Sequence, residues 1–248
     1  MDVQRMKKLA GRGGMSRREF MGVALASGMT VTAAQALFTQ IARAEPQKGG
    51  RFRIAPSEQE MRRKQFYWPD TNILITRFLH TEGIGEIEDY MPVRGSGPVP
   101  DALVRRVRVV RGRLPFLLEC RPAFDYARAA HSLRINEHGA CFESPGLRLG
   151  LSSPIPLKPN QAGGVSARFT LSEGESHTFH LRPLTGEQTA GHSANPDEAE
   201  DLFRETVQYW RRWLSKCTYT GRWREAVQRS ALTLKLLSFA PTGAIIAA

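Results

Sequence analysis

The chain has 248 residues, enough for one large domain or two modest ones, which excludes a disulfide miniprotein. Its hydrophobic fraction of 41% and its 22 glycines are those of ordinary globular chains and exclude disorder throughout. The formal net charge of +11 suggests a nucleic-acid or membrane-surface partner. However, residues 65–248 carry 22 basic and 19 acidic residues, so the excess charge lies near the N-terminus and we expect no nucleic-acid partner.

Residues 1–44 have the order of an export signal: a basic stretch, a mildly apolar run and a small-x-small cleavage site. The paired arginines resemble a twin-arginine signal, whose motif and cleavage residues would be Ser16, Arg17, Arg18 and Phe20, then Ala42 and Ala44. This run contains too many polar residues for a stable transmembrane helix, which needs about 20 predominantly apolar residues. We therefore expect the twin-arginine export machinery as a partner. The protein would be exported or periplasmic if the signal is used, and cytoplasmic otherwise. The alternative to an export signal is an amphipathic N-terminal helix with an accidental Arg-Arg pair.

Short β-type runs separated by Gly and Pro fill the region from residue 65 to about residue 181. Two runs, 72–80 and 85–93, flank a turn at 81–84, and two more, 103–110 and 114–120, flank Arg111-Gly112-Arg113. Shorter runs follow at 132–136, 140–143, 147–152, 165–171 and 176–181. This spacing predicts an antiparallel β-sandwich, complete or lacking some strands, and not alternating β and α units.

Charged residues alternate with apolar ones in two neighbouring runs. Val107 and Val109 lie on one face of the run 103–110, and Arg106 and Arg108 lie on the other, which predicts a half-buried strand with a solvated basic face. Glu86 and Glu88 would share a face at a spacing that paired catalytic carboxylates tolerate. A solvated sheet face is the favoured interpretation, because most strand acids are exposed.

Histidine and cysteine patterns predict no metal site and no cofactor. Cys120, Cys141 and Cys217 have no metal-type spacing and form no disulfide framework. His177 and His180 lie three residues apart on a predicted strand, so they point to opposite faces and cannot chelate one ion.

The pattern becomes helical at Asn195, where Asn195-Pro196-Asp197-Glu198 supplies a cap, a first-turn proline and acids for the helix dipole. Apolar residues then recur at three- and four-residue steps, which predicts a helix of about five turns. A second helix is expected over 222–239, ending at Pro241-Thr242-Gly243. Its Trp223, like Trp210 and Trp213 of the first helix, would suit sugar stacking, but core packing against the sandwich is favoured.

Several stretches resemble a known family. Gly49-Gly50-Arg51-Phe52-Arg53-Ile54-Ala55-Pro56, then 66–78 and 85–93, resemble the N-terminal region of bacterial glycoside hydrolase family 15, which includes glucoamylases, glucodextranases and trehalase-like enzymes. Residues 229–237 and 240–248 resemble the passage where such proteins enter their catalytic barrel. The resemblance covers residues 49–248 and implies an N-terminal β-sandwich, a helical linker and the first helix of an (α/α)6 barrel.

The chain departs from that family at both ends. The export signal stands where further sandwich residues are normal, and the first 54 residues resemble the start of a transporter solute-binding protein, so a fusion is expected. The sugar-contacting runs Trp-Asp-Tyr-Arg and Trp-Leu-Arg-Asp do not occur. The catalytic carboxylates of the family lie later, on the barrel, so no catalytic, substrate-binding or metal residue is assigned here.

The expected organisation is a signal at 1–44, a linker or fusion junction at 45–64, a β-sandwich at 65–190, and a helical linker with the first helix of a truncated barrel at 195–248. The expected function is that of the non-catalytic N-terminal portion of a protein that hydrolyses α-glucosides or trehalose. Whether the chain is itself an enzyme stays open, and carbohydrate is a partner only if the barrel is present. The alternatives are an exported carbohydrate-binding module and a fragment of a transporter solute-binding protein.

Overall fold

The computed structural model describes residues 17–26, 30–32, 49–57, 61–93, 101–190, 195–239 and 241–246. The chain divides into one unit of residues 1–50 with 123–130 and a second of 51–122 with 131–248. In the first unit, α2 (Arg17–Ala26) includes the backbone of Arg17, Arg18 and Phe20. Ser16, Ala42 and Ala44 lie outside the described residues, so the export signal stays a prediction.

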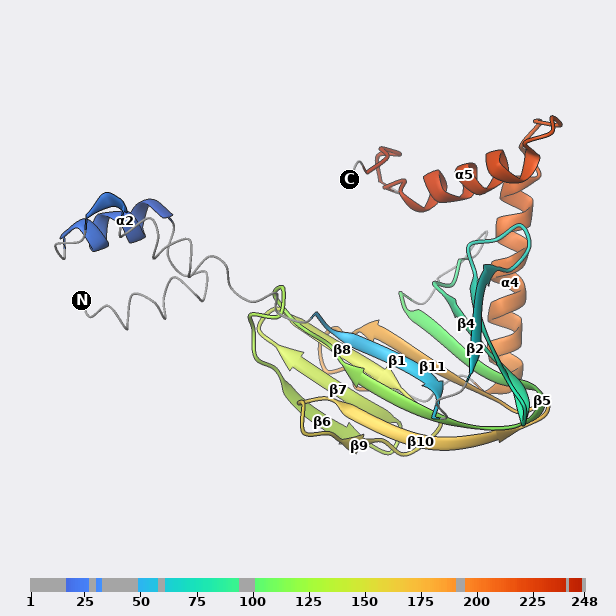
Figure 1. Ribbon diagram of the computed structural model, residues 1–248, viewed down its shortest axis with the longest axis horizontal. Coiled ribbons are helices and arrows are strands. Elements are labelled where there is room, and N and C mark those ends of the chain that lie inside the picture. Colours follow the sequence, from blue (N-terminus) through green and yellow to red (C-terminus); the bar gives the residue numbers. More distant parts are fainter. Residues whose placement is uncertain are drawn as a thin grey trace. The chain divides into compact units, whose positions relative to one another are not determined.

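The second unit is mainly antiparallel β structure with helices at its C-terminal end, as the sequence predicts (Figure 1). One path of paired strands runs β2-β3-β4-β5-β11-β8-β7-β6, and β1, β10 and β9 extend from the second half of β5. The strands are β1 (Arg51–Pro56), β2 (Arg62–Tyr67), β3 (Leu74–His80), β4 (Gly83–Tyr90), β5 (Leu103–Arg121), β6 (Ser132–Asn136), β7 (Gly139–Ser144), β8 (Leu147–Ser152), β9 (Lys158–Pro159), β10 (Val165–Ser172) and β11 (Ser176–Pro183).

A single 19-residue strand, β5, replaces the two strands predicted at 103–110 and 114–120. Its first half pairs with β4 and β11, and its second half pairs with β1 and β10. Gly112 has φ +74° and lies so close to β4 that a Cβ would meet the carbonyl oxygen of Glu82 at 2.0 Å. The glycine therefore bends the strand without reversing it, and β5 curves from one layer into the other (Figure 1).

The sheet also starts earlier in the chain than predicted. Residues 45–64 were expected to form a linker or junction, yet they contain β1 and the first residues of β2. Arg51 and Arg53 concealed β1 in the sequence: both side chains are exposed, while Ile54 of the same strand is buried against β5. The remaining predicted strands match β3, β4, β6, β7, β8, β10 and β11 within a few residues at each end.

Aromatic and aliphatic side chains fill the space between the two groups of strands. The ring of Phe169 on β10 stacks on Phe116 of β5 at 5.4 Å and contacts Phe179 of β11 at 5.8 Å between centroids. Phe116 and Phe179 are fully buried, as are Leu118 on β5 and Phe142 on β7. This core makes the β region a sandwich, because rings from both layers interdigitate.

The helix α4 (Pro196–Leu214) begins where the sequence predicts, with Asn195 as its cap. The Asn195 side chain accepts a hydrogen bond from the Glu198 backbone N–H at 2.9 Å, and the Glu198 carboxylate accepts one from the Asn195 N–H at 3.0 Å. This reciprocal capping box satisfies two helix-end donors. It fixes the first turn of α4.

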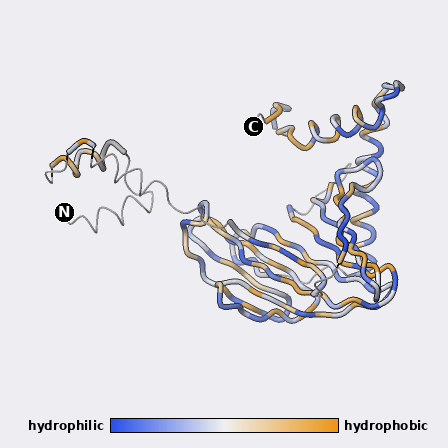
Figure 2. Tube along the Cα trace, viewed as in Figure 1, coloured by the Kyte–Doolittle hydropathy of each residue, from blue (hydrophilic) through white to orange (hydrophobic). Residues whose placement is uncertain are grey.

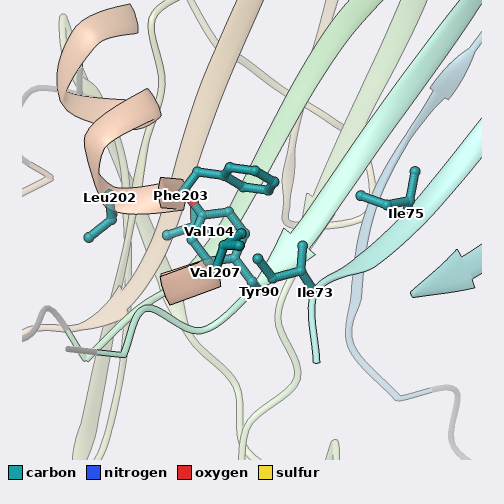
Figure 3. Packing of buried hydrophobic residues seen from close by; sticks show 7 residues of the cluster. All are labelled: Ile73, Ile75, Tyr90, Val104, Leu202, Phe203 and Val207. Carbon is teal, nitrogen blue, oxygen red and sulfur yellow. The ribbon is translucent and has the colours of Figure 1, made fainter. Parts of the chain in front are cut away.

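One face of α4 packs on the sheet through a hydrophobic cluster that Figure 3 shows. Phe203 lies at its centre, with edge-on ring contacts to Trp68 at 5.4 Å and to Tyr90 at 5.8 Å. The cluster consists of Ile73, Ile75, Tyr90, Val104, Leu202, Phe203 and Val207. The helix thus covers the face of β3, β4 and β5 that bears these residues.

A second helix, α5 (Arg224–Leu236), is held at the loop between β2 and β3. The Arg229 guanidinium donates to Asn72 Oδ1 at 3.0 Å and to the Thr71 carbonyl at 2.7 Å, and lies 4.0 Å from the centre of the Tyr67 ring. Asn72 in turn donates to the carbonyl of Leu232, which is buried with Trp210 and Leu214 of α4.

Several positions of α5 and the following segment are apolar, orange in Figure 2. Many of these side chains are also exposed. The exposed side chains are Trp223, Leu234, Leu236, Leu237, Phe239, Ile245 and Ile246. Within the described parts of the chain, no helix combines the length and apolarity needed to cross a membrane.

We expect Phe203→Ala to lower the free energy of unfolding by about 3–5 kcal/mol, because it removes the buried ring through which α4 contacts Trp68 and Tyr90 of β4. Urea unfolding followed by circular dichroism measures the loss. Arg204→Ala is the control, since its exposed side chain should change stability by less than about 0.5 kcal/mol. Equal effects of the two substitutions would contradict the packing of α4 on the sheet.

Candidate functional site

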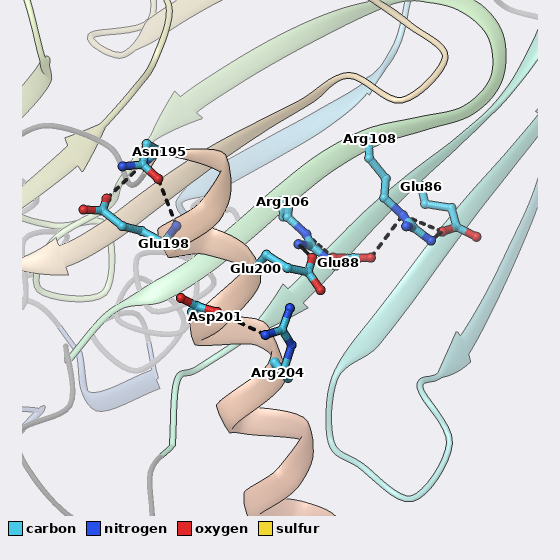
Figure 4. A network of polar contacts seen from close by, with 9 residues as sticks. All are labelled: Glu86, Glu88, Arg106, Arg108, Asn195, Glu198, Glu200, Asp201 and Arg204. Carbon is cyan, nitrogen blue, oxygen red and sulfur yellow. Dashed lines mark hydrogen bonds and ion pairs between the residues drawn. The ribbon is translucent and has the colours of Figure 1, made fainter.

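Strand register places the candidate acids opposite arginines. In the β4–β5 pair, Glu86 lies opposite Arg108 and Glu88 lies opposite Arg106. In the β3–β4 pair, Arg77 lies opposite Glu86. Residues directly opposite in an antiparallel pair have Cβ atoms close enough for their side chains to interact. The charged residues therefore form a row of cross-strand ion pairs. Figure 4 shows the pairs between β4 and β5.

Glu88 and Arg106 form the most deeply buried of these pairs. Arg106 Nε donates to Glu88 Oε2, and its Nη1 donates to Glu200 Oε2 of α4 at 2.5 Å. The same guanidinium lies 4.5 Å from the centre of the Phe203 ring. Arg106 thus joins β4 to α4 through two carboxylates and an aromatic face.

Glu86 is paired on both sides. Its Oε1 accepts from Arg77 Nε at 2.6 Å, and its Oε2 accepts from Arg108 Nη2 at 2.6 Å. The second Glu88 oxygen, Oε1, lies 3.2 Å from Arg108 Nε. Arg108 therefore links the two glutamates into one network.

The prediction that Glu86, Glu88 and Arg106 lie on a solvated sheet face is wrong. Glu86 is 1% exposed, Glu88 is 0% exposed and Arg106 is 5% exposed. The alternation of charged and apolar residues indicated two faces correctly, and Val107 and Val109 are buried on the other one. It could not indicate that α4, more than 90 residues later, covers part of the charged face.

Burial raises the pKa of the Glu88 carboxyl, and the hydrogen bond and charge of Arg106 oppose that rise. Burial alone would lower the pKa of Arg106, but its hydrogen bonds and ion pairs with Glu88 and Glu200 outweigh it and raise the pKa. A glycosidase acid must reach the leaving oxygen of a sugar, and its partner must reach water. Glu86 and Glu88 are buried and occupied by arginines, so their arrangement suits structure and not hydrolysis.

The tryptophans divide between core and surface. Trp210 is buried, and Trp213 packs against the cluster of Trp210, Leu214 and Leu232. Trp223 is 59% exposed, so the prediction that it packs in the core is wrong. It precedes α5 and contacts the guanidinium of Arg222 at 4.4 Å.

The histidines and cysteines for which the sequence predicts no metal site have different surroundings. His177 is beside Phe169, and both His177 and His180 are partly buried on β11. Cys120 is buried, and burial raises its thiol pKa to about 12, whereas Cys141 accepts a hydrogen bond from the Ala190 N–H. All three cysteines are free.

A polar cavity of about 220 Å³ lies on the opposite face of β2–β5, beside β1. Its wall includes an ion pair in which Arg105 Nε and Nη2 donate to the two carboxylate oxygens of Asp89 at 2.6 and 3.0 Å. The other polar side chains of the wall are Arg53, Arg63, Gln65 and Thr76. No local motif in the sequence predicts this group, because its members come from five strands.

Comparison with known proteins finds trehalases. A trehalase of Thermoplasma acidophilum is 33% identical over 209 residues, which is 82% of this chain and 35% of that protein. A trehalase of Thermoplasma volcanium is 29% identical over 81% of this chain, and one of Mycobacterium tuberculosis is 34% identical over 59%. The chain spans about a third of the length of the two Thermoplasma trehalases. No family model matches. Most of the chain is trehalase-like in sequence.

We expect Glu88→Ala to lower the free energy of unfolding by about 3–5 kcal/mol, because it leaves the buried Arg106 guanidinium without its main partner. Glu200→Ala is the matched control: it removes the other Arg106 partner, which is 48% exposed, and should cost less than about 1 kcal/mol. Urea unfolding of both variants makes the comparison. A smaller loss for Glu88→Ala would contradict a buried pair at the base of α4.

Acid should destabilise the fold partly through β11. Burial lowers the pKa of His177 and of His180 from 6.5, and the Arg182 charge lowers that of His180 further. Below pH 6.5 the unfolded chain therefore binds more protons at these sites than the native protein, so stability falls as pH falls.

The double variant His177→Gln/His180→Gln should lose less stability than the parent between about pH 6.5 and pH 5. Urea unfolding across this range, referred to about pH 8 where both histidines are neutral, measures the two slopes. Identical slopes would show that the histidines are not buried as neutral groups.

Proposed function

We propose that the chain is the accessory β-rich region of a trehalase-like enzyme of glycoside hydrolase family 15. In this proposal it supports a helical catalytic unit and does not itself cleave the glycosidic bond. The observation that carries it is the 33% identity to a trehalase over 82% of the chain. The strand-then-helix order fits the sandwich and linker that the family resemblance implies.

The apolar surface of α5 supports an accessory role. Leu234 and Leu236 are about half exposed, and Phe239 and Ile246 beyond the helix are more than half exposed. A soluble domain rarely leaves so many large apolar side chains together in water. Further helices packed on this surface would bury it, which is the position that a barrel has in the family.

The state of the acids supports a non-catalytic role. Glu86 and Glu88 have the spacing of a carboxylate pair, but each is neutralised by arginine and shielded from solvent. The Glu88 charge holds Arg106, which also donates to Glu200 of α4, whereas Glu86 pairs with Arg77 and Arg108. The hydrolytic carboxylates would then belong to the catalytic unit.

The N-terminal segment extends the proposal to location. Ser16, Arg17, Arg18 and Phe20, with Ala42 and Ala44, would direct export through the twin-arginine machinery and then release of the signal. An accessory region of an enzyme that hydrolyses trehalose outside the cytoplasm would need such a signal.

A chimera tests the accessory role. The matching region of the Thermoplasma acidophilum trehalase is replaced by the matching part of this chain, and glucose release from trehalose is measured. The chimera should hydrolyse trehalose, whereas Leu234→Lys with Leu236→Lys should abolish hydrolysis by charging the surface that meets the catalytic unit. Arg204→Ala, on α4, is the control and should retain activity.

The 248-residue chain provides an independent measurement. Incubated alone with trehalose, it should release no glucose above the blank. Glucose release by the chain alone would overturn the non-catalytic role. A chimera that melts cooperatively but is inactive, or one that is unaffected by the two lysines, would overturn the accessory role.

A further inference from the structure

We propose that the polar cavity beside β1 binds one pyranose ring of a glucoside. The choice of a glucoside rests on the proposed function. The choice of a neutral polyol rests on the chemistry of the cavity alone.

The cavity is lined by β1 and by one face of β2–β5. On that face, register places Gln65 opposite Thr76, Thr76 opposite Ile87, and Asp89 opposite Arg105. Because side chains alternate along a strand, these residues all point away from the charged row that α4 covers. β1 supplies Phe52 and Ile54 to the wall of the cavity. The site is therefore built on paired strands, which hold their side chains more firmly than loops do.

The polar groups of the wall are fixed but not saturated. Arg105 donates through Nε and Nη2 to Asp89 and through Nη1 to the Phe52 carbonyl, and its guanidinium lies 4.6 Å from the centre of the Phe52 ring. Three of its five N–H groups are used in these bonds, and the Asp89 carboxylate retains lone pairs. Gln65 donates to Thr76 Oγ1 at 3.0 Å, which leaves its carbonyl oxygen able to accept.

The wall therefore offers both donors and acceptors: Arg105 and Arg63 can donate, and Asp89 and Gln65 can accept. Neighbouring hydroxyls of a sugar each donate and accept one hydrogen bond, which is the complementary pattern. The apolar side chains of Phe78 and Ile87 face the same space and suit the C–H face of a pyranose. A cavity with a few oriented polar groups and apolar walls is the usual form of a small-molecule site.

An anion fits the cavity less well. Arginine is abundant around it, but the charge of Arg105 is neutralised by the bidentate pair with Asp89. The remaining arginines, Arg53 and Arg63, are exposed to water. An anion in the cavity would lie beside the Asp89 carboxylate, and this repulsion favours an uncharged ligand.

The volume limits the ligand to one ring. About 220 Å³ equals the liquid volume of about seven water molecules, which accommodates a single pyranose. The second ring of a disaccharide would extend into solvent. A monosaccharide glycoside and a disaccharide should therefore bind with similar affinity.

Calorimetry of the 248-residue chain tests the site with methyl α-glucoside, trehalose and inorganic phosphate as probes. Both sugars should bind with a Kd of about 1 mM, and phosphate should not compete with them. Gln65→Ala and Arg63→Ala should each weaken sugar binding about fivefold, because each removes one exposed partner without disturbing the Arg105–Asp89 pair. Arg62→Ala and Lys64→Ala are matched controls from the opposite face of the same strand and should change Kd less than twofold.

Three results would overturn the sugar site: no heat with either sugar at about 10 mM, equal weakening by the control and test variants, or displacement of the sugar by phosphate. None of them bears on hydrolysis by the chimera. Conversely, an inactive chimera together with sugar binding that Gln65→Ala weakens would remove the accessory role and leave the binding site in place.

Discussion

The attachment of α4 depends on the ion pair between Glu88 and Arg106. Both side chains are almost completely buried, and removing either would leave the other with only a more exposed partner, Glu200 for Arg106 or Arg108 for Glu88. Arg106 also contacts Glu200 and the ring of Phe203, so one guanidinium joins a strand, its neighbour and a helix. The hydrophobic cluster around Phe203 supplies apolar contacts between α4 and the sheet, and the hydrogen bond from Arg106 to Glu200 adds a directional one.

The curved strand β5 gives the two faces of the sheet different chemistry. Arg105 and Arg106 are adjacent in sequence, so they point to opposite faces. Arg106 joins the network under α4, and Arg105 pairs with Asp89 in the wall of the polar cavity. The bend at Gly112 moves the second half of β5 into the other layer. Because β1 pairs with that half, it lies beside the cavity and not on the sheet face that α4 covers. One strand thus organises both the helix attachment and the proposed sugar site.

Periodicity predicted most strands, the cap at Asn195 and the start of α4, because these depend on neighbours within a few residues. It did not predict β1, whose exposed arginines conceal a strand, or the continuity of β5, since Gly112 suits a turn and a bend equally well. The burial of Glu88 and the grouping of Asp89 with Gln65 were also missed. Both result from contacts between distant segments, for which the only local signal was the match of acids on one run to arginines on the next.

The helix α5 is held by few contacts within the described residues. A helix of 13 residues has little stability of its own and normally depends on tertiary packing. Leu232 is the one residue of α5 that is fully buried, and polar contacts from Arg229 and Asn72 fix the helix at the β2–β3 loop. With α5 held in this orientation, the side chains of Leu234 and Leu236 on the same helix remain exposed. In the proposed accessory role, further helices would pack on these apolar residues, and burying them would stabilise α5 and its partner together.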